Sequence, residues 1–200
     1  MTDIILASAS LRRSEILKRA GIEHVVIEPL IDEGSLDPGG IVHAVCELAR
    51  RKAEDVRERT SVKGLIIAAD TVVCLGATVM GKPADEDEAR LMLSRLSGRW
   101  HRVMTGYCIM ESPEDYVKGH VVTRVRFRKI HKTEIEEYIK TDEPYDKAGG
   151  YGIQSRASVF VKKINGCYFN VMGLPVCKIF SILKKYESKY EIIRKADKEY

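Results

Sequence analysis

A run of five apolar residues at positions 65–69, Leu-Ile-Ile-Ala-Ala, constrains the fold more than any other part of the sequence. A continuous apolar run of this length is typical of a central strand that is buried on both faces. The run stops at Asp70-Thr71, and the apolar character resumes at residues 72–75. The sequence therefore predicts a buried strand that ends at a carboxylate.

This position makes Asp70 the first candidate for chemistry. The edge of a core strand is a standard place for catalytic or metal-binding groups in α/β sheets. An aspartate at the end of a strand also commonly caps a turn or accepts hydrogen bonds from the backbone. From the residues alone, both interpretations of Asp70 stay open.

The opening stretch predicts a strand, a tight loop and a helix. Residues 4–7 are apolar, residues 8–10 read Ser-Ala-Ser, and a helix is expected from Leu11 to a stop at Gly21. Backbone N–H groups without helical partners converge at the start of such a helix, where the dipole is positive. The loop is therefore suited to an anion.

Arg12 and Arg13 lie in the first turn of that helix. Cations there oppose the helix dipole by roughly 0.3–1 kcal/mol each, so a helix built only for stability would carry acids instead. A phosphate or carboxylate in the loop would turn the cost into an attraction. The alternative is that both arginines are solvated surface residues and that Ser10 caps the helix.

A lysine interrupts the apolar stripe of the next helix, which is expected from Asp37-Pro38 to about Arg59. The stripe consists of Ile41, Val45, Leu48 and Val56, and Lys52 falls in its middle. An ammonium on a buried face needs a partner. Either Lys52 reaches toward an anion in a cleft, or its stem packs while its head extends to water.

Capping and alternation patterns predict a helix and two long strands after the buried strand. A capping-box pattern at Asp85 and Glu88 opens a helix that stops at Ser97-Gly98. Two long strands are predicted at residues 100–110 and 116–129. Alternation in the second strand buries one face and leaves an arginine-rich face, which we interpret as solvated.

Two glycine signals follow in the last third of the chain. Residues 145–154 contain three glycines within four positions and end in Gln154, a composition that permits close approach of the backbone to a ligand. Asn165-Gly166 predicts a hairpin between strands at residues 159–164 and 167–170.

Composition excludes several classes of protein. The chain has 33 basic and 29 acidic residues, and half of the excess of four lies in residues 184–200, so nucleic acid is not expected as a partner. The sequence contains no apolar run long enough to span a membrane, and no signal peptide is predicted at its start. The five cysteines are scattered without metal-ligand spacing, which favours the reducing cytoplasm.

Several stretches, in order, match the pattern of one family. They are the run Ser8-Ala9-Ser10-Leu11-Arg12-Arg13, Glu33, Lys52, residues 69–73, Lys82-Pro83, Leu96-Ser97-Gly98, residues 146–149 and 151–154, Asn165-Gly166 and Gly173-Leu174-Pro175. On these motifs, the chain from Met1 to about Tyr186 resembles a Maf-family nucleoside triphosphate pyrophosphatase. The family usually has proline where this chain has Leu11, and because leucine also starts helices well, the chemistry is not expected to change.

The resemblance implies a mixed α/β fold of two lobes around a central cleft, with a long mixed β-sheet, as in the inosine-triphosphate pyrophosphatases. Residues 1–186 would form a single domain, followed by a charged tail at 187–200. Members of the family are often homodimers. The implied reaction hydrolyses a nucleoside triphosphate to the monophosphate and pyrophosphate with a divalent metal, Mg²⁺ or Mn²⁺.

The resemblance also implies roles for single residues. The triphosphate would be held by Ser8, Arg12, Lys52 and Lys82. The metal would be bound by Glu33 and Asp70, and Asp70 would be the catalytic residue that orients or deprotonates the attacking water. The subgroup that acts on dTTP and UTP is matched at Arg13, Thr71 and Gln154.

Two alternatives accompany this prediction. The sister subgroup acts on 7-methyl-GTP and typically differs at the three last-named positions. A different class of protein would be a nucleotide-binding regulator of septum formation without significant catalysis, since the family is associated with cell-division arrest as well as with cleaning of the nucleotide pool. The presence of both carboxylates, Glu33 and Asp70, favours an enzyme, because a protein that only binds triphosphate gains nothing from acids unless it holds a metal.

Overall fold

The computed structural model describes residues 3–32 and 40–193 of the 200-residue chain. Its strands are β1 (Ile4–Ala7), β2 (Val25–Ile27), β3 (Leu65–Leu75), β4 (Thr78–Met80), β5 (Trp100–Met110), β6 (Tyr116–Phe127) and β7 (Val161–Asn165). Its α-helices are α1 (Leu11–Arg19), α2 (Ile41–Arg59), α3 (Glu86–Leu96), α4 (Lys132–Ile139), α5 (Tyr168–Val171) and α6 (Val176–Leu183). Short 3₁₀ helices are η1 (Ala148–Gly150), η2 (Arg156–Phe160) and η3 (Lys184–Tyr186).

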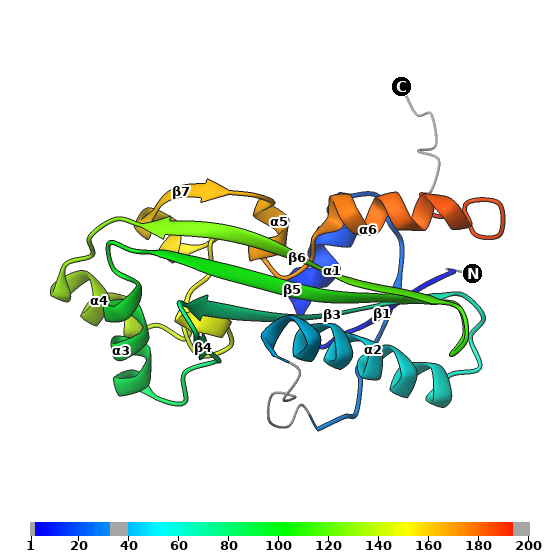
Figure 1. Ribbon diagram of the computed structural model, residues 1–200, viewed down its shortest axis with the longest axis horizontal. Helices are drawn as coiled ribbons and strands as arrows, with labels where there is room; N and C mark the ends of the chain where they lie inside the picture. The colour runs from blue at the N-terminus through cyan, green and yellow to red at the C-terminus, as the bar shows by residue number, and fades with distance from the viewer. Residues whose placement is uncertain (1–2, 33–39, 194–200) are drawn as a thin grey trace. The chain divides into compact units, whose positions relative to one another are not determined.

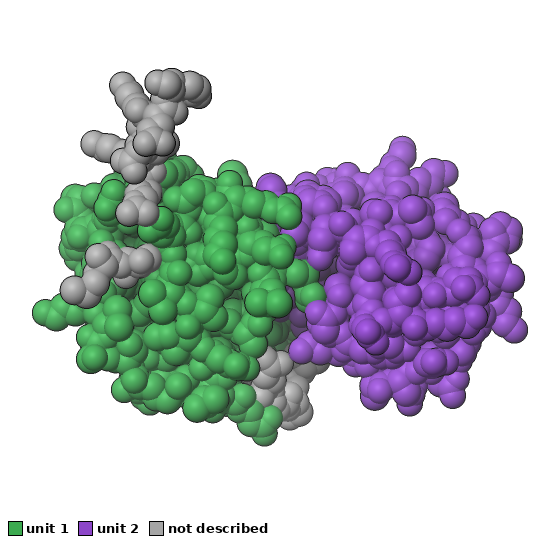
Figure 2. Space-filling model, turned by 180° about the vertical axis from the view of Figure 1, so that it is seen from behind, with its two compact units in different colours: residues 1–70, 106–120, 173–200 green, residues 71–105, 121–172 purple. Residues whose placement is uncertain are grey.

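The strands form one mixed sheet in the order β2-β1-β3-β5-β6-β7, with β4 paired to β3 (Figure 1). β1 is parallel to both of its neighbours, whereas β4 and β7 are antiparallel to β3 and β6. The predicted mixed α/β fold with a long mixed sheet is confirmed. The chain forms two compact units (Figure 2): unit 1 comprises residues 1–70, 106–120 and 173–200, and unit 2 comprises residues 71–105 and 121–172.

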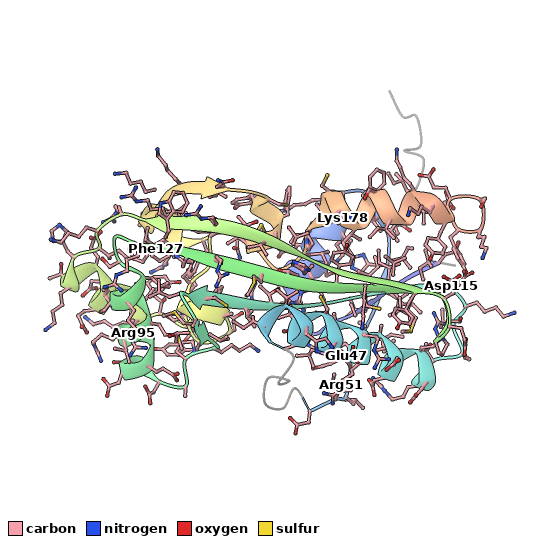
Figure 3. The ribbon with its side chains drawn as sticks, in the orientation of Figure 1. Glu47, Arg51, Arg95, Asp115, Phe127 and Lys178 are labelled. Carbon is pink, nitrogen blue, oxygen red and sulfur yellow. The ribbon has the colours of Figure 1, made fainter. Side chains whose placement is uncertain are left out.

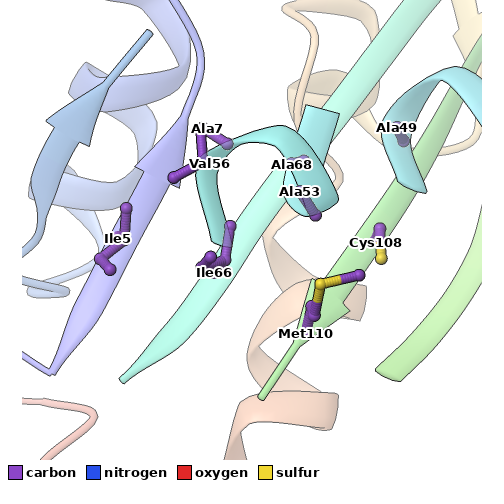
Figure 4. Packing of buried hydrophobic residues seen from close by; sticks show 9 residues of the cluster. All are labelled: Ile5, Ala7, Ala49, Ala53, Val56, Ile66, Ala68, Cys108 and Met110. Atoms are coloured by element: carbon purple, nitrogen blue, oxygen red, sulfur yellow. The ribbon is translucent and has the colours of Figure 1, made fainter. Parts of the chain in front are cut away.

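The core of unit 1 lies between helix α2 and the parallel strands. Ile5 is in register with Ile66, and Ala7 with Ala68, on β1 and β3. The fully buried cluster consists of Ile5, Ala7, Ala49, Ala53, Val56, Ile66, Ala68, Cys108 and Met110 (Figure 4). Because four of its members are alanines, the helix can lie close to the sheet.

Gly106 on β5 is the point of closest approach to α2. A Cβ atom at this position would lie 2.2 Å from the carbonyl oxygen of Val45. No side chain fits at that distance, so glycine is required by space and not by backbone conformation.

The first part of the predicted tail packs on unit 1. Ile192 is buried, with 3% of its surface exposed. Lys189 Nζ and Tyr190 Oη both donate hydrogen bonds to the Glu111 carboxylate, and Glu191 N donates one to Asp3 Oδ2 at 3.2 Å. Residues 187–193 therefore contribute to the fold of unit 1, and the remainder of the tail lies outside the described residues.

Strand β3 corrects one expectation. It runs without a break through Asp70 and Thr71, where the sequence predicted an interruption. Backbone pairing in a sheet does not depend on apolar side chains, provided that polar ones find partners. Asp70 is bonded to Lys52 and Thr71 to Thr105, so both residues remain in the strand.

The predicted start and stop of helix α3 and the predicted end of helix α2 are confirmed. Asp85 Oδ1 accepts a hydrogen bond from Glu88 N at 2.8 Å, which confirms the capping interaction at the start of α3. Gly98 follows the helix with a φ of 72°, as expected for a glycine stop. Helix α2 ends at Arg59 as predicted, while its expected start at Asp37-Pro38 lies outside the described residues.

The predicted hairpin at Asn165-Gly166 is wrong. β7 pairs with β6, and the chain after Gly166 enters the short helix α5 rather than a second strand. The buried amide of Asn170 explains this, because its Nδ2 donates to Val103 O and to Thr123 Oγ1, each at 3.1 Å. These tertiary bonds outweigh the local turn preference.

Candidate functional site

Ser8 is the centre of the loop between β1 and α1 in unit 1. Its side chain is buried, with 2% of the residue exposed, and its Oγ accepts hydrogen bonds from Ser10 N and from an Arg13 guanidinium nitrogen, each at 3.1 Å. The Ser10 side chain makes no capping bond to α1. Ser8 rather than Ser10 therefore organises the loop at the start of the helix.

Arg13 connects this loop to a distant motif of the same unit. Its Nε donates a hydrogen bond to the carbonyl oxygen of Gly173 at 2.8 Å. Arg12 is half-buried beside it on the first turn of α1. The alternative of two merely solvated arginines is therefore wrong for Arg13, which holds the Ser8 loop and residue 173 together. Its predicted contact with a nucleotide base stays a prediction.

Lys52 and Asp70 form an ion pair between α2 and β3. Lys52 Nζ lies 2.8 Å from Asp70 Oδ1, and the side chains are 6% and 14% exposed. The stem of Lys52 does not carry its head to water, so that alternative is wrong. Asp70 does not cap a turn either. The pair places a charged carboxylate, fixed by a cation, at the end of the apolar part of a central strand.

Thr71 is the first site residue of unit 2 and belongs to a hydroxyl chain. Its Oγ1 lies 2.9 Å from Thr105 Oγ1, and Thr105 Oγ1 in turn donates to the carbonyl oxygen of Asn170 at 3.1 Å. Thr105 is fully buried. Because the Asn170 carbonyl can only accept, the Thr71 hydroxyl is the donor to Thr105. This orients Thr71, and no motif in the sequence pointed to Thr105.

The glycine-rich stretch of unit 2 is shaped by positive φ angles of 71° at Gly149 and 69° at Gly150. Gly149 N donates to the Gly81 carbonyl at 2.8 Å, which brings this stretch to the segment carrying Lys82. Lys82 is exposed, and Gln154 is half-buried. The structure thus places Lys82 and the glycine-rich stretch on neighbouring segments of unit 2.

Glu143 anchors the end of this stretch, a role that the sequence did not indicate. Its carboxylate accepts hydrogen bonds from Tyr138 Oη at 2.9 Å, Ser155 Oγ at 2.7 Å and Arg156 N at 3.2 Å. These bonds lower the pKa of Glu143, against the opposing effect of its burial, which is the largest single influence. Ser155 directly follows Gln154, so Glu143 fixes the backbone next to a predicted specificity residue.

His101 supports the same stretch from strand β5. Its Nε2 lies 2.7 Å from Tyr151 Oη, and the residue is 2% exposed. Among the described residues, Nδ1 has no hydrogen-bond partner. Burial lowers the pKa of His101 from 6.5 to about 4. The imidazole is therefore neutral at physiological pH.

This shift predicts a pH dependence of stability. The unfolded chain binds a proton at His101 below about pH 6.5, whereas the folded chain does so only near pH 4. The free energy of unfolding should therefore fall by up to about 3 kcal/mol as the pH is lowered through this window. Urea unfolding at a series of pH values measures it. His101→Gln should flatten the profile, the exposed control His120→Gln should not, and an unchanged profile in His101→Gln would contradict the assignment.

The predicted metal ligands can be examined only in part. Glu33 lies outside the described residues, and within residues 3–32 and 40–193 no cluster of three His, Cys, Asp or Glu side chains could hold a metal. Asp70 fits Mg²⁺ or Mn²⁺ as a single ligand, since it is an oxygen donor of partial exposure with one oxygen bonded to Lys52. Such ions are usually held by one or two carboxylates together with phosphate oxygens and water.

The fold of this chain matches that of a solved protein. The HAM1 protein from Coxiella burnetii matches 92% of this chain with 100% of its own, at a TM-score of 0.52 and 15% sequence identity, so the two share a fold. The chain belongs to the Maf family, because the family model described as Maf-like protein matches residues 3–186. The family and the mixed α/β fold that the resemblance implied are confirmed.

Relatives cover nearly the whole chain. The dTTP/UTP pyrophosphatase of Carboxydothermus hydrogenoformans is 47% identical over 92% of this chain and 98% of its own length. The dTTP/UTP pyrophosphatase of Thermococcus kodakarensis is 49% identical over 86% of this chain and 91% of its own length. That of Aquifex aeolicus is 43% identical over 91% and 94%. Among the described residues, no helix is both long and apolar enough to cross a membrane.

Proposed function

We propose that the protein is a nucleoside triphosphate pyrophosphatase that hydrolyses dTTP and UTP to the monophosphate and pyrophosphate. The observation that carries this proposal is the near full-length similarity, at 47% and 49% identity, to relatives named for that activity. The buried Lys52–Asp70 pair supports it, because a carboxylate held in a fixed position can act as the general base that accepts a proton from water.

In the proposed reaction, a water oxygen bonds to the α-phosphorus and the bond to the oxygen bridging the α- and β-phosphates breaks. Asp70 takes the proton of the water, and pyrophosphate leaves with the electron pair of the broken bond. Lys52 holds Asp70 Oδ1, which leaves the other carboxylate oxygen as the one that would receive the proton. Lys52 is thus assigned to positioning the base in addition to its predicted contact with phosphate.

The substrate contacts follow from charge. A triphosphate carries roughly four negative charges and calls for several cations and N–H donors. We assign this task to the Ser8 loop, Arg12, Lys52 and Lys82, and we assign recognition of the base and its neighbouring phosphate to Arg13, Thr71 and Gln154. The bonds of Arg13 to Gly173 and of Thr71 to Thr105 support this, because they hold both side chains in fixed orientations.

A divalent cation, Mg²⁺ or Mn²⁺, would be held by Asp70 and Glu33 and would neutralise phosphate charge and increase the acidity of water. We expect the enzyme to be a cytoplasmic homodimer that cleans the pool of pyrimidine nucleotides.

The test is release of pyrophosphate with Mg²⁺ or Mn²⁺ from dTTP, UTP, CTP, GTP, 7-methyl-GTP and ITP. Turnover led by dTTP and UTP is the expected result. Turnover led by 7-methyl-GTP would overturn the roles of Arg13, Thr71 and Gln154 while keeping the reaction. No turnover of any substrate would overturn the enzyme and favour a nucleotide-binding regulator.

A further inference from the structure

Strands β6 and β7 and the end of α3 form an open pocket of about 510 Å³ within unit 2. It is lined by Ser94, Ser97 and Gly98 at the end of α3, by residues 126 and 127 of β6 and the two residues that follow, and by Lys162 of β7. Phe127, labelled in Figure 3, marks its β6 side. None of the predicted site residues lines this pocket, which we call the β6–β7 basic pocket.

The strand pairing at this pocket brings like charges together. Arg126 is directly opposite Lys163 in the antiparallel pair. Val125 and Phe127 are fully buried, so Arg126 and its partner Lys163 point to the other face. The register shifts between Arg126 and Phe127, which makes Lys162 an additional residue of a bulge beside them. Like charges directly opposite each other destabilise a sheet.

Among the described residues, nearby carboxylates compensate only one of the cations in this region, Arg128. Glu134 is bonded through both oxygens to Arg128, which is thereby neutralised. No carboxylate in the described part of the chain bonds to Arg126, Lys129, Lys162 or Lys163. Two residues earlier on β6, Arg124 is accommodated differently, since it lies opposite Asn165 and stacks on Trp100 with its guanidinium carbon 5.1 Å from the ring centroid.

We propose that the β6–β7 basic pocket binds a small polyanion with two or three linked phosphate groups. Three cations that bond to no carboxylate of the described chain, Arg126, Lys129 and Lys162, line this concavity and together exceed the charge of a single phosphate group, and the volume falls in the range of small-molecule sites. Charge-assisted bonds from arginine and lysine to phosphate are among the strong hydrogen bonds of proteins. The proposal revises our interpretation of the arginine-rich face as merely solvated, and it does not depend on the proposed catalytic activity.

The test uses inorganic tripolyphosphate in low salt with a chelator to remove metal ions. Binding is followed by the amide NMR shifts of Ser97, Gly98 and Lys129, which line this pocket. The double variant Arg126→Gln/Lys162→Gln should bind about 100-fold more weakly at these signals, from roughly a tenfold loss for each charge-assisted bond. The matched control Arg124→Gln should bind as the wild type does, and turnover of dTTP should be unchanged in both.

Equal binding in the double variant and the wild type would overturn the proposal. So would an equal loss in Arg124→Gln, because it would indicate a general effect of charge. Tighter binding of a single-stranded oligoribonucleotide at the same signals would also overturn it in favour of nucleic acid. ATP as a second probe identifies the source of the phosphates. If ATP binds more tightly than tripolyphosphate, the ligand is a nucleotide, and if the two bind equally, the pocket recognises the phosphate chain alone.

Thermal unfolding provides a second readout. Without tripolyphosphate, Arg126→Gln should have a higher melting temperature than the wild type in low salt, because the like-charge pair with Lys163 is removed. With tripolyphosphate, the upward shift of the melting temperature should be smaller in Arg126→Gln. A lower melting temperature without the anion, together with an undiminished shift, would contradict the proposal.

Discussion

Asp70→Asn should reduce the rate of pyrophosphate release from dTTP by about 10³-fold or more while the protein stays folded. Asparagine has the shape of aspartate and can still accept the hydrogen bond from Lys52 Nζ, so strand β3 and helix α2 keep their contact. It lacks the negative charge and the basicity that a proton acceptor needs, and general bases typically contribute 10²–10⁴-fold to a rate. The measurement is steady-state pyrophosphate release, with circular dichroism as a check of the fold.

Asp87→Asn is the matched control for this experiment. Asp87 is an acid on the first turn of α3 with a 94% exposed side chain, and its loss should leave turnover unchanged. Ordinary activity in Asp70→Asn would remove Asp70 from the role of base. Equal losses in both variants would indicate that the acids act only through the overall charge of the protein.

Lys52→Met should lower the free energy of unfolding by about 2–4 kcal/mol and should also reduce turnover strongly. Removing one partner of a buried ion pair leaves the other charge without compensation, at a typical cost of 3–5 kcal/mol. The cost is somewhat lower here because the Asp70 side chain is 14% exposed. Methionine replaces the stem of lysine, so the packing of α2 changes little. Urea unfolding measures the effect.

The double variant Lys52→Met/Asp70→Asn separates charge from packing. It should be more stable than Lys52→Met alone, because the buried charge is then absent. Lys118→Met is the control, since Lys118 pairs with Glu47, labelled in Figure 3, at 2.9 Å with a 37% exposed side chain. An exposed pair of this kind is worth roughly 0–1 kcal/mol. A double variant less stable than Lys52→Met would show that the pair is not the source of the loss.

Local patterns predicted the elements whose signals are contained in neighbouring residues. The loop between β1 and α1, the capped start of α3 and its glycine stop at Gly98 all appear where the sequence placed them. In each case, a hydrogen bond or a backbone angle within a few residues decides the structure. The family resemblance added the fold class, which such local signals do not determine.

Features that depend on distant partners could not be predicted in the same way. The continuity of β3 at Asp70 depends on Lys52, which lies 18 positions earlier, and the helical turn after Gly166 depends on bonds of Asn170 to Val103 and Thr123. The sequence indicated that Lys52 needs a partner but did not name it. Thr105 bonds to the predicted site residue Thr71, while Glu143 and His101 bond to neighbours of Gln154 in the chain, and these side-chain bonds leave no periodic or spaced pattern in the sequence.

The close approach at Gly106 determines whether Lys52 on α2 can reach Asp70, the proposed catalytic carboxylate. Val45, whose carbonyl faces Gly106, and Lys52 are seven positions apart and so lie on the same side of α2. Any side chain at position 106 would push this part of the helix outward, and the lysine would retreat from Asp70. In a library that varies position 106, we therefore expect the active members to carry glycine. A selection for nucleotide hydrolysis should thus retain this glycine although it touches no substrate.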